Sequence, residues 1–362
     1  MLSNQPKRNK YFVSFVVGYF PALHKFAPYQ NYYLYPSIVA HECGYAPIVI
    51  IKEGHDILRN DPNLPEYVTV LEYKNIFWFI YLLTKYSLAR SVFYINNHQP
   101  QSYFALVYTK VLLRKNIFMG HIQPKRTSLL RQKVFNFALC FTARVRLNNQ
   151  SEVNFLLAQG FKEEKLYIVP IAVNTQSFFL EKTDYATRRD IVYYGNMTTQ
   201  KGIPTLLEAF SLVKKSISDV KFHIVGGTGN YDPETDIKKY QLSDSVILHG
   251  EYRHGLELNK LLNQFKVFVI STKAEGQCMA VYESALAGNA LCLPNIMSFG
   301  EVFKGKALFH ELGDAQTLAN NIMAYLGDTR LVEEDNQACR DMIETEYNEQ
   351  IVKKEFLGLL TF

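Results

Sequence analysis

The sequence predicts an α/β protein with two doubly wound parallel sheets, on the strength of three observations. At 362 residues the chain is longer than one hydrophobic core usually serves, so two domains are expected. In both halves short apolar runs alternate with amphipathic segments of helical period, which is typical of parallel strands joined by crossover helices. A polar stretch, EKTDYATRRD (181–190), separates the halves and is the predicted linker.

The first predicted domain covers residues 1–182. Its short apolar runs are typical of buried strands, and we expect strands at Tyr11–Val17, Tyr45–Ile51, Ser91–Asn96, Asn116–Gly120 and Leu166–Val169. Helical periodicity between these runs predicts helices at Gln30–Glu42, Asn75–Tyr86, Ser102–Leu113, Thr127–Phe137 and Gln150–Ala158.

The second predicted domain covers residues 183–345 and repeats the alternation more regularly. Strands are expected at Ile191–Tyr194, Lys221–Val225, Val246–Leu248, Val267–Ser271 and Ala290–Leu293. Helices are expected at Ile203–Lys214, Leu256–Gln264, Met279–Leu286 and Ala315–Tyr325. The final residues, 346–362, contain NEQIVKKEFLGLLTF, which predicts one more amphipathic helix with a basic middle.

Composition argues against several classes of protein. Hydrophobic residues make up 48% and charged residues 20%, proportions of a globular rather than a disordered chain. The longest apolar run, FWFIYLL (77–83), is far below the roughly 20 residues of a membrane-spanning helix. The N-terminus has no signal-peptide pattern, so a cytoplasmic protein is expected. Five widely spaced cysteines predict reduced thiols, with neither a disulfide framework nor a zinc site.

Charge is divided unevenly between the two halves. Residues 1–182 carry 21 Lys and Arg against 10 Asp and Glu, whereas residues 183–362 carry 18 against 24. The basic half interleaves cations with apolar pairs between Lys110 and Lys133, a pattern suited to the surface of an anionic membrane. A merely solvated charged face is the alternative. No recognisable nucleic-acid motif accompanies the charge, so nucleic acid is not an expected partner.

Two glutamates flank the short apolar stretch EGQCMAVYE (275–283), which follows the predicted strand VFVIS. Ligands of doubly wound sheets bind beyond the carboxyl ends of the strands, and this is where Glu275 lies. A helix starting at Met279 would offer its N-terminus to a phosphate, and Glu283 would lie in that helix. Carboxylates also accept hydrogen bonds from sugar hydroxyls. The alternative is a pair of solvated glutamates that happen to flank a helix.

Two more turns after strands belong to the same half. The stretch YYGNMTTQKGIPTLLEAF (193–210) contains Gly195, Asn196 and Lys201, and a lysine at such a turn can meet a diphosphate as a point charge. The stretch VKFHIVGGTGNY (220–231) contains Gly227, where a ligand can come close to the backbone. Alone, a glycine-rich turn is weak evidence, and this one lacks the full dinucleotide fingerprint.

Taken in order, these motifs resemble the retaining nucleotide-sugar glycosyltransferases of the GT-B fold, glycosyltransferase family 4. The resemblance covers residues 191–294 well, and PIAVNTQSF (170–178) is similar to the family's interdomain segment. It implies two Rossmann-like domains facing each other across a cleft, the first binding the acceptor and the second the donor. It also implies that the C-terminal helix crosses back to the first domain.

The resemblance also implies roles for individual residues. Glu275 would hold hydroxyls of the donor sugar at the catalytic centre, Glu283 the nucleotide ribose, and Lys201 the diphosphate. The other implied donor-binding positions are Gly195, Asn196, Gly227, Gln277, Cys278 and Met279.

Histidines are the candidates in the first domain. His121 follows a predicted strand, and the resemblance implies that it positions the donor and the developing charge as a catalytic residue. His98 follows another strand and is assigned to the acceptor side, with His24 in the first loop as a further acceptor-side candidate. A lone histidine near an apolar run is more often structural, and that remains the alternative for each.

The reaction implied is transfer of a hexose-type sugar from a UDP- or GDP-linked donor to a hydroxyl of a glycan or lipid-linked acceptor. It would serve surface polysaccharide or glycoconjugate synthesis at the inner face of the membrane. No cofactor or metal is implied, because the lysine and the helix dipole would stabilise the leaving diphosphate.

The sequence departs from the family pattern in two places. Asn196 stands where family members usually carry an arginine, and the usual glycine pair of the first loop is missing beyond Gly18. Arg253, Lys273 or a basic residue of the first domain is a candidate substitute for that arginine. A degenerate GT-B protein that binds nucleotide sugar or glycan without turnover is therefore the main alternative. A sugar-nucleotide epimerase is a second one, which the glutamate pair and the KG turn disfavour.

Overall fold

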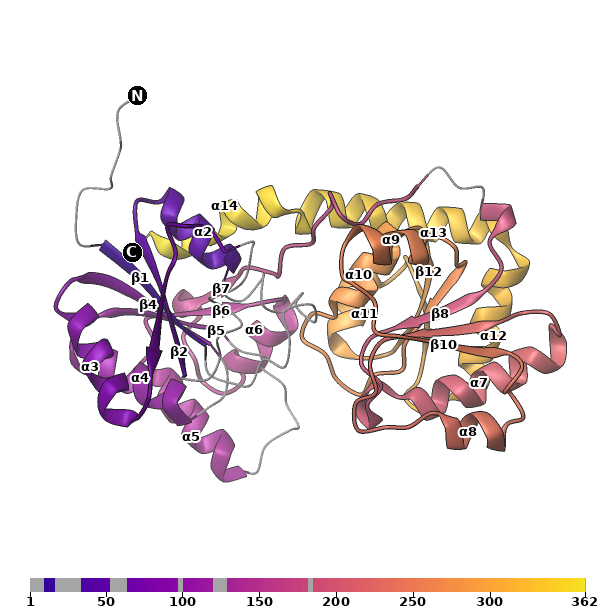
Figure 1. Ribbon diagram of the computed structural model, residues 1–362, viewed down its shortest axis with the longest axis horizontal. Helices are drawn as coiled ribbons and strands as arrows, with labels where there is room; N and C mark the ends of the chain where they lie inside the picture. The colour runs from indigo at the N-terminus through magenta and orange to yellow at the C-terminus, as the bar shows by residue number, and fades with distance from the viewer. Residues whose placement is uncertain are drawn as a thin grey trace. The chain divides into compact units, whose positions relative to one another are not determined.

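The chain forms two compact units in the computed structural model (Figure 1). Residues 10–16, 34–52, 64–96, 100–119, 129–181 and 185–361 are described. The first unit consists of Met1–Ile171 and Gln350–Phe362, and the second of Ala172–Glu349. Within the described residues no helix is both long and apolar enough to cross a bilayer.

The first unit is built on a seven-stranded parallel sheet in the order β3-β2-β1-β4-β5-β6-β7. Its strands are β1 (Lys10–Val16), β2 (Ala46–Lys52), β3 (Thr69–Tyr73), β4 (Arg90–Asn96), β5 (Lys115–Met119), β6 (Arg144–Leu147) and β7 (Leu166–Ile168). Its helices are α2 (Tyr35–Glu42), α3 (Ile76–Ser87), α4 (Pro100–Val111), α5 (Leu129–Cys140), α6 (Gln150–Leu157) and α14 (Glu349–Leu360).

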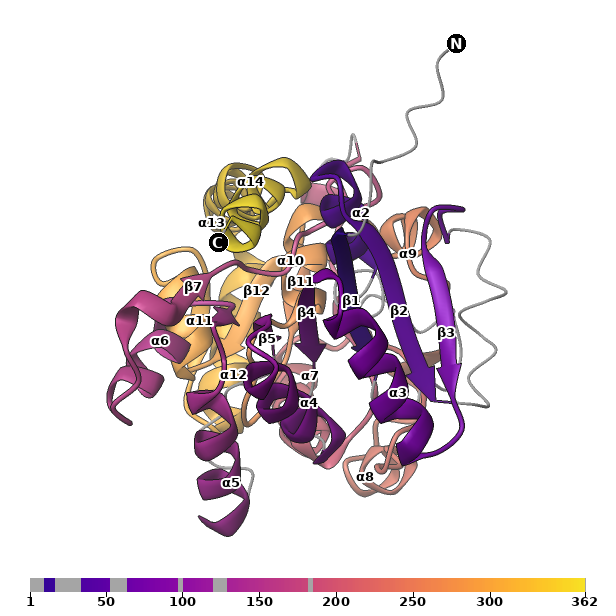
Figure 2. The same cartoon turned by 90° about the vertical axis from the view of Figure 1, so that its left-hand side faces the viewer.

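Alternation along the strands assigns these helices to the two faces of the sheet. Phe15 in β1 packs against Phe79 of α3, in the core that also receives α4, α5 and α6. Phe12 of the same strand points the other way and packs against Phe356 of α14. In Figure 2, α3 and α4 lie together in front of the sheet, and α2 and α14 lie above it.

The second unit holds a six-stranded parallel sheet in the order β10-β9-β8-β11-β12-β13. Its strands are β8 (Ile191–Tyr194), β9 (Phe222–Val225), β10 (Val246–Gly250), β11 (Val267–Val269), β12 (Ala290–Pro294) and β13 (Leu308–His310). Its helices are α7 (Ile203–Ser216), α8 (Glu234–Lys239), α9 (Leu256–Leu262), α10 (Met279–Leu286), α11 (Met297–Phe303), α12 (Ala315–Gly327) and α13 (Thr329–Met342).

The strand order fixes where a ligand can bind in the second unit. Successive crossovers run from β8 towards β10 on one side and from β11 towards β13 on the other, so the order reverses between β8 and β11. Because right-handed crossovers then put α7 and α10 on opposite faces, a crevice is expected beyond the carboxyl ends of these two strands.

Three strands were not predicted from the sequence, namely β3, β6 and β13. The sequence of β6 is RVRL, whose two arginines hide an inner strand. Arg146 is 1% exposed, and its guanidinium donates to the carbonyls of Val169 at 2.8 Å and Pro170 at 2.7 Å and to the hydroxyl of Tyr94 at 2.8 Å. A buried arginine is tolerated because its donors are satisfied.

The boundary between the units lies at Ile171/Ala172 rather than at residue 182. The segment that follows belongs to the second core, since Val173 and Phe178 are both fully buried in it. Val173 N also donates to the carbonyl of Tyr347 at 2.8 Å. After α13 the chain returns to the first unit in α14, where Arg144 donates to the carbonyl of Leu359 at 2.7 Å.

Candidate active site

Lys201 and Glu275 meet at the carboxyl ends of β8 and β11. Lys201 lies in the turn between β8 and α7, and its Nζ is 2.5 Å from Oε1 of Glu275. The hydroxyl of Thr272 donates to the same carboxylate oxygen at 2.9 Å. Both charged side chains are largely buried, at 23% and 14% exposure. A cation and an anion are therefore held together at the point where the strand order reverses.

Gly202 allows the two loops to come this close. Its φ of +73° is one that favours glycine, and a Cβ there would lie 2.1 Å from the carbonyl oxygen of Ser271. On either side, Lys273 N donates to the carbonyl of Gln200 at 3.0 Å, and the Gln200 amide donates to the carbonyl of Ala274 at 3.0 Å. Backbone contact thus positions the Lys201–Glu275 pair.

Glu283, on α10, is 2% exposed, and its two carboxylate oxygens differ in their contacts. Oε1 lies 2.8 Å from Nε2 of His254, whose ring packs against Phe178 at 5.0 Å. Burial by itself would lower the pKa of His254, but the charge and hydrogen bond of Glu283 raise it above its ordinary value of 6.5. Oε2 is buried and has no hydrogen-bond partner within the described residues. A buried carboxylate oxygen without a donor is expected to have one when ligand binds.

The N-terminus of α10 lies between the two glutamates in the chain. Cys278 is its N-cap and forms no side-chain cap, and the first turn contains no acidic residue. Gln277 and Cys278 are buried, and Met279 is half-buried. Burial raises the pKa of the Cys278 thiol to about 12, the charge of Lys201 opposing this, so the thiol stays neutral at physiological pH. The first backbone N–H groups of α10 and its positive dipole end are thus set in a neutral, partly apolar environment.

The glycine loops after β8 and β9 run side by side. Gly195 N donates to the carbonyl of Val225 at 2.9 Å, and Met197 N donates to the carbonyl of Gly227 at 3.0 Å. A Cβ on Gly226 would lie 2.0 Å from the carbonyl oxygen of Gly195, so these backbones are in direct contact. Asn196 is exposed at the tip of the first loop. Its carbonyl accepts a hydrogen bond of 2.9 Å from the hydroxyl of Tyr193.

The structure thus joins two of the sequence-predicted residues directly, Lys201 and Glu275, and places the others of the second unit on the loops and helix around the same strand ends. His24, His98 and His121 lie outside the described residues, and their roles stay predictions. His254 and Thr272, which contact the two glutamates, were missed. His254 precedes α9 in YRHG, and a single histidine in a loop carries no spacing signal.

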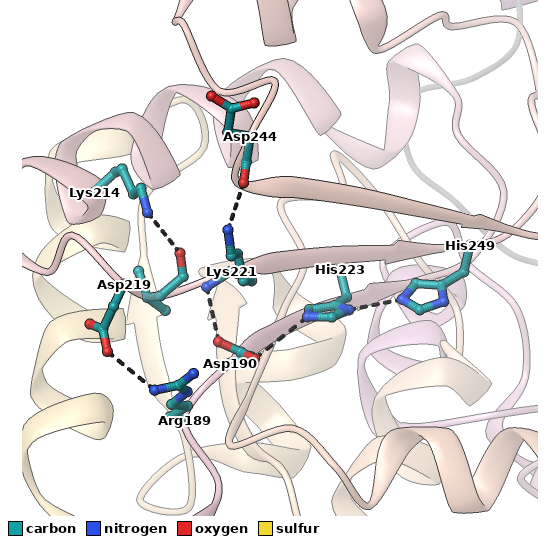
Figure 3. A network of polar contacts seen from close by, with 9 residues as sticks. Arg189, Asp190, Lys214, Asp219, Lys221, His223, Asp244 and His249 are labelled. Carbon is teal, nitrogen blue, oxygen red and sulfur yellow. Dashed lines mark hydrogen bonds and ion pairs between the residues drawn. The ribbon is translucent and has the colours of Figure 1, made fainter.

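A second group of titratable residues in this unit lies elsewhere (Figure 3). Asp190 precedes β8, accepts from Lys221 N at 2.9 Å and is 3.6 Å from His223 Nε2. His223 Nδ1 is in turn 2.8 Å from Nε2 of His249. Asp190 and Lys221 flank the amino ends of β8 and β9, so this network joins the strands at the edge away from the Lys201–Glu275 pair.

Comparison with known protein families gives a match to the model described as glycosyl transferases group 1, over residues 176–348. That range contains every strand of the second sheet together with Lys201, Glu275 and Glu283. The second unit of this chain belongs to the glycosyl transferases group 1.

Curated relatives of this group 1 glycosyltransferase chain include a phosphatidylinositol N-acetylglucosaminyltransferase protein of Arabidopsis thaliana. The two are 27% identical over 207 residues, which are 54% of this chain and 45% of that protein. The putative colanic acid biosynthesis glycosyltransferase WcaL of Escherichia coli is 25% identical over 217 residues, which are 57% of this chain and 53% of that protein. The chain spans about half the length of the curated relatives it matches.

Solved structures resemble the group 1 glycosyltransferase chain along nearly its whole length. Anabaena HepE in complex with UDP and glucose has a TM-score of 0.80 at 12% identity, covering 98% of this chain and 100% of that one. Staphylococcus aureus TarM in complex with fondaparinux, α-GlcNAc-glycerol and UDP has a TM-score of 0.77 at 13% identity, with the same coverages. At such identities the likeness establishes the fold, and the chain has the α/β architecture of GT-B glycosyltransferases.

Proposed function

We propose that the protein is a retaining glycosyltransferase that moves a hexose-type sugar from a UDP- or GDP-linked donor to a hydroxyl of a glycan or lipid-linked acceptor. The observation that carries this proposal is the unsatisfied, buried Oε2 of Glu283 beside the N-terminus of α10 and near the strand ends that hold the Lys201–Glu275 pair. Family membership of residues 176–348 and the names of the relatives support the same reaction class.

In this proposal each end of the donor has its own partner. Glu283 accepts hydrogen bonds from ribose hydroxyls through Oε2, while His254 occupies and orients Oε1. Lys201 releases Glu275 in part to meet the diphosphate, and Glu275 turns its second oxygen to hydroxyls of the sugar. The pair is preformed, so binding replaces an ion pair rather than exposing two bare charges.

Departure of the nucleoside diphosphate is the step that needs charge stabilisation. Lys201 and the free N–H groups at the start of α10 supply it, and a metal ion is not needed. His121 keeps the role that the family resemblance implies for it, on the reactive side of the sugar. The leaving phosphate takes the proton of the acceptor hydroxyl on the same face, so the anomeric configuration is retained.

The acceptor and the location complete the proposal. Relatives act in colanic acid synthesis and on phosphatidylinositol, by their names, and a surface polysaccharide or lipid-linked acceptor at the inner face of the membrane fits both. His98 and His24 remain the acceptor-side candidates. The cytoplasm is the expected compartment, because sugar nucleotides are its metabolites.

A second candidate function, binding of sugar nucleotide without turnover, is favoured by Asn196 alone. This residue lies exposed where the family pattern has an arginine. An Asn196→Arg variant discriminates between the two, because the added cation would strengthen the hold on the diphosphate. If the wild-type chain is active, the variant raises the affinity for the donor; if it is a degenerate binder, the variant is needed for any transfer.

The first experiment is isothermal titration of the protein with UDP, GDP and their hexose derivatives, followed by a coupled assay of diphosphate release with and without candidate acceptors. Glu283→Gln is expected to weaken nucleotide binding about tenfold or more, because a charge-assisted hydrogen bond is lost. Glu257→Gln, an exposed change of the same chemistry, is the control. Nucleotide binding without acceptor-dependent release would contradict transfer, and an inverted product would contradict retention. A loss of activity in EDTA would contradict metal independence.

A further inference from the structure

A cavity of about 570 Å³ lies at the amino edge of the sheet in the first unit. Lys10, Arg90 and Lys115 are the first residues of β1, β4 and β5, which are neighbours in the sheet, and all three line the cavity. Lys10 is opposite Arg90 in the register, and Arg114 is a fourth cation of the lining. The C-terminal end of α14 forms another wall, next to β1 and α2 in Figure 1.

Positive charge in this cavity is not balanced by carboxylates. None of the described residues that line it is acidic. Lys10, Arg90 and Arg114 form no ion pair in the part of the chain that the structure describes, and Nε of Arg114 is buried without a hydrogen-bond partner there. Glu42, at the end of α2, is engaged by Lys353. Converging cations with an unsatisfied donor are expected to attract an anion.

The sequence around the cavity has the same bias. From residue 73 to residue 151 the chain contains twelve Lys and Arg and no Asp or Glu. This stretch includes α3, β4, α4, β5 and α5, which form one side of the first unit. Seventy-nine residues without one carboxylate give this side a positive field that favours an extended anionic partner over a single small ion.

Exposed leucines flank the cations. Leu88 is 81% exposed and comes two residues before Arg90, and Leu113 is 87% exposed and directly precedes Arg114. Leu113 has a φ of +56°, a left-handed conformation that costs a leucine about 1 kcal/mol or more. Leu113 also lines the cavity. The turns that carry the two leucines enter adjacent strands, so both lie at the same edge of the sheet.

Cations at this edge have a simpler explanation, which is only partial. The carboxyl ends of α3 and α4 lie just before Arg90 and Arg114, and cations there complement the helix dipoles. Helix capping accounts for neither the buried, unpartnered Nε of Arg114 nor a fully exposed leucine held in a strained conformation.

We propose that this cavity binds the phosphate group of an anionic phospholipid, with Leu88 and Leu113 entering the apolar layer beside the head group. Guanidinium groups suit a phosphate because their donors match its oxygens. Leucines gain free energy only if the phosphate belongs to a lipid, because a free anion would leave them in water. The site is at the opposite sheet edge from the one where doubly wound folds bind substrates, so its test does not depend on the proposed transferase activity.

The test is co-sedimentation of the full chain with vesicles of phosphatidylcholine, with and without phosphatidylglycerol. The C-terminus is left untagged because Thr361 lines the cavity. Wild-type protein is expected to bind the anionic vesicles, and Arg90→Gln/Arg114→Gln to bind them roughly 30-fold more weakly. Lys215→Gln/Lys260→Gln, two exposed cations of the second unit, removes the same charge and is expected to bind nearly as wild type.

A second variant separates lipid contact from stability. Leu113→Asn removes the apolar side chain and relieves the backbone, because asparagine tolerates a positive φ. It is expected to raise the melting temperature and yet to weaken vesicle binding roughly fivefold. Gln241, with a φ of +58° and an exposed side chain in the second unit, is the matched site: Gln241→Asn is expected to raise the melting temperature and leave vesicle binding unchanged.

Three results would overturn the proposal. One is equal binding of anionic vesicles by the wild-type protein and Arg90→Gln/Arg114→Gln. Another is equal binding by Leu113→Asn and Gln241→Asn. The third is saturable binding of inorganic phosphate or glycerol phosphate by wild-type protein that does not sediment with vesicles, which would assign the cavity to a soluble anion. Nucleotide binding, measured on the same samples, reports on the donor site separately.

Discussion

The two oxygens of Glu283 are in different situations, and this difference carries the assignment of the donor site. One oxygen is fixed by His254 and the other is buried without a donor in the described part of the chain. A glutamate with only a packing role would be expected to have both oxygens paired or solvated. His254 is therefore a positioning residue, and its protonation state matters because its partner is an anion.

The raised pKa of His254 gives a pH dependence with a definite sign. The folded state holds the proton more tightly than the unfolded state, so the pair stabilises the fold fully below the ordinary pKa of 6.5. That contribution is lost as pH rises through the higher pKa of the folded state. His254→Gln keeps a hydrogen-bond donor but cannot be charged. Urea unfolding from about pH 5.5 to about pH 9 is expected to show a smaller decline for His254→Gln than for wild type. Identical declines would show that His254 does not titrate against Glu283.

Between elements, the junction of β11 with the turn before α7 decides the geometry of the site. Gly202 lies against the carbonyl of Ser271, so the loop that carries Lys201 cannot move away from Glu275 without breaking this contact. The pair is therefore a property of the two loops together. Neither β8 nor β11 alone would bring the two side chains within hydrogen-bond distance.

Substitution of Gly202 measures this close approach. Gly202→Ala is expected to destabilise the protein by about 2 kcal/mol or more, because the methyl group both strains the backbone and meets the Ser271 carbonyl. Gly305→Ala is the matched control, since its φ of +74° is nearly the same and no atom lies within 4 Å of the added Cβ. Its cost is expected to be about 1 kcal/mol. Equal losses in chemical denaturation would mean that backbone strain alone, and not the contact with Ser271, matters at Gly202.

At the scale of the whole molecule, the two units have separate cores. One core is formed by residues between Val173 and Tyr347, and the other by residues between Val13 and Leu156. The nucleotide site and the cationic cavity belong to different units, at the carboxyl edge of one sheet and the amino edge of the other. The two sites are therefore expected to respond to their ligands separately.

Hydrogen exchange tests this separation. UDP or GDP, whichever binds, is expected to slow amide exchange in α10 and in the loops after β8 and β9, because ligand binding lowers the population of open states there. Helices α3 to α6 are expected to exchange at unchanged rates. Protection spreading through α3 and α4 on addition of nucleotide alone would contradict independent sites.

Local sequence patterns were sufficient for most elements and for the location of the candidate site. Glu275, Lys201 and the glycine turns follow apolar runs directly, and a turn after a strand is visible from neighbouring residues alone. Arg146 shows the limit of this approach, because a charged residue in a short strand looks exposed until its partners are known. His254 shows a second limit, because it meets Glu283 across 29 residues of chain.

The sequence by itself determined the α/β class, the order of the strands along the chain and the edge of the second sheet where ligands are sought, because periodicity and turn chemistry are local properties. Only the tertiary structure decided which side chains meet: the ion pair of Lys201 with Glu275, the pairing of His254 with one oxygen of Glu283, and the convergence of Lys10, Arg90 and Lys115 in one cavity. These contacts depend on which strands become neighbours in the sheet, and the free energy that selects that order comes from packing the whole core.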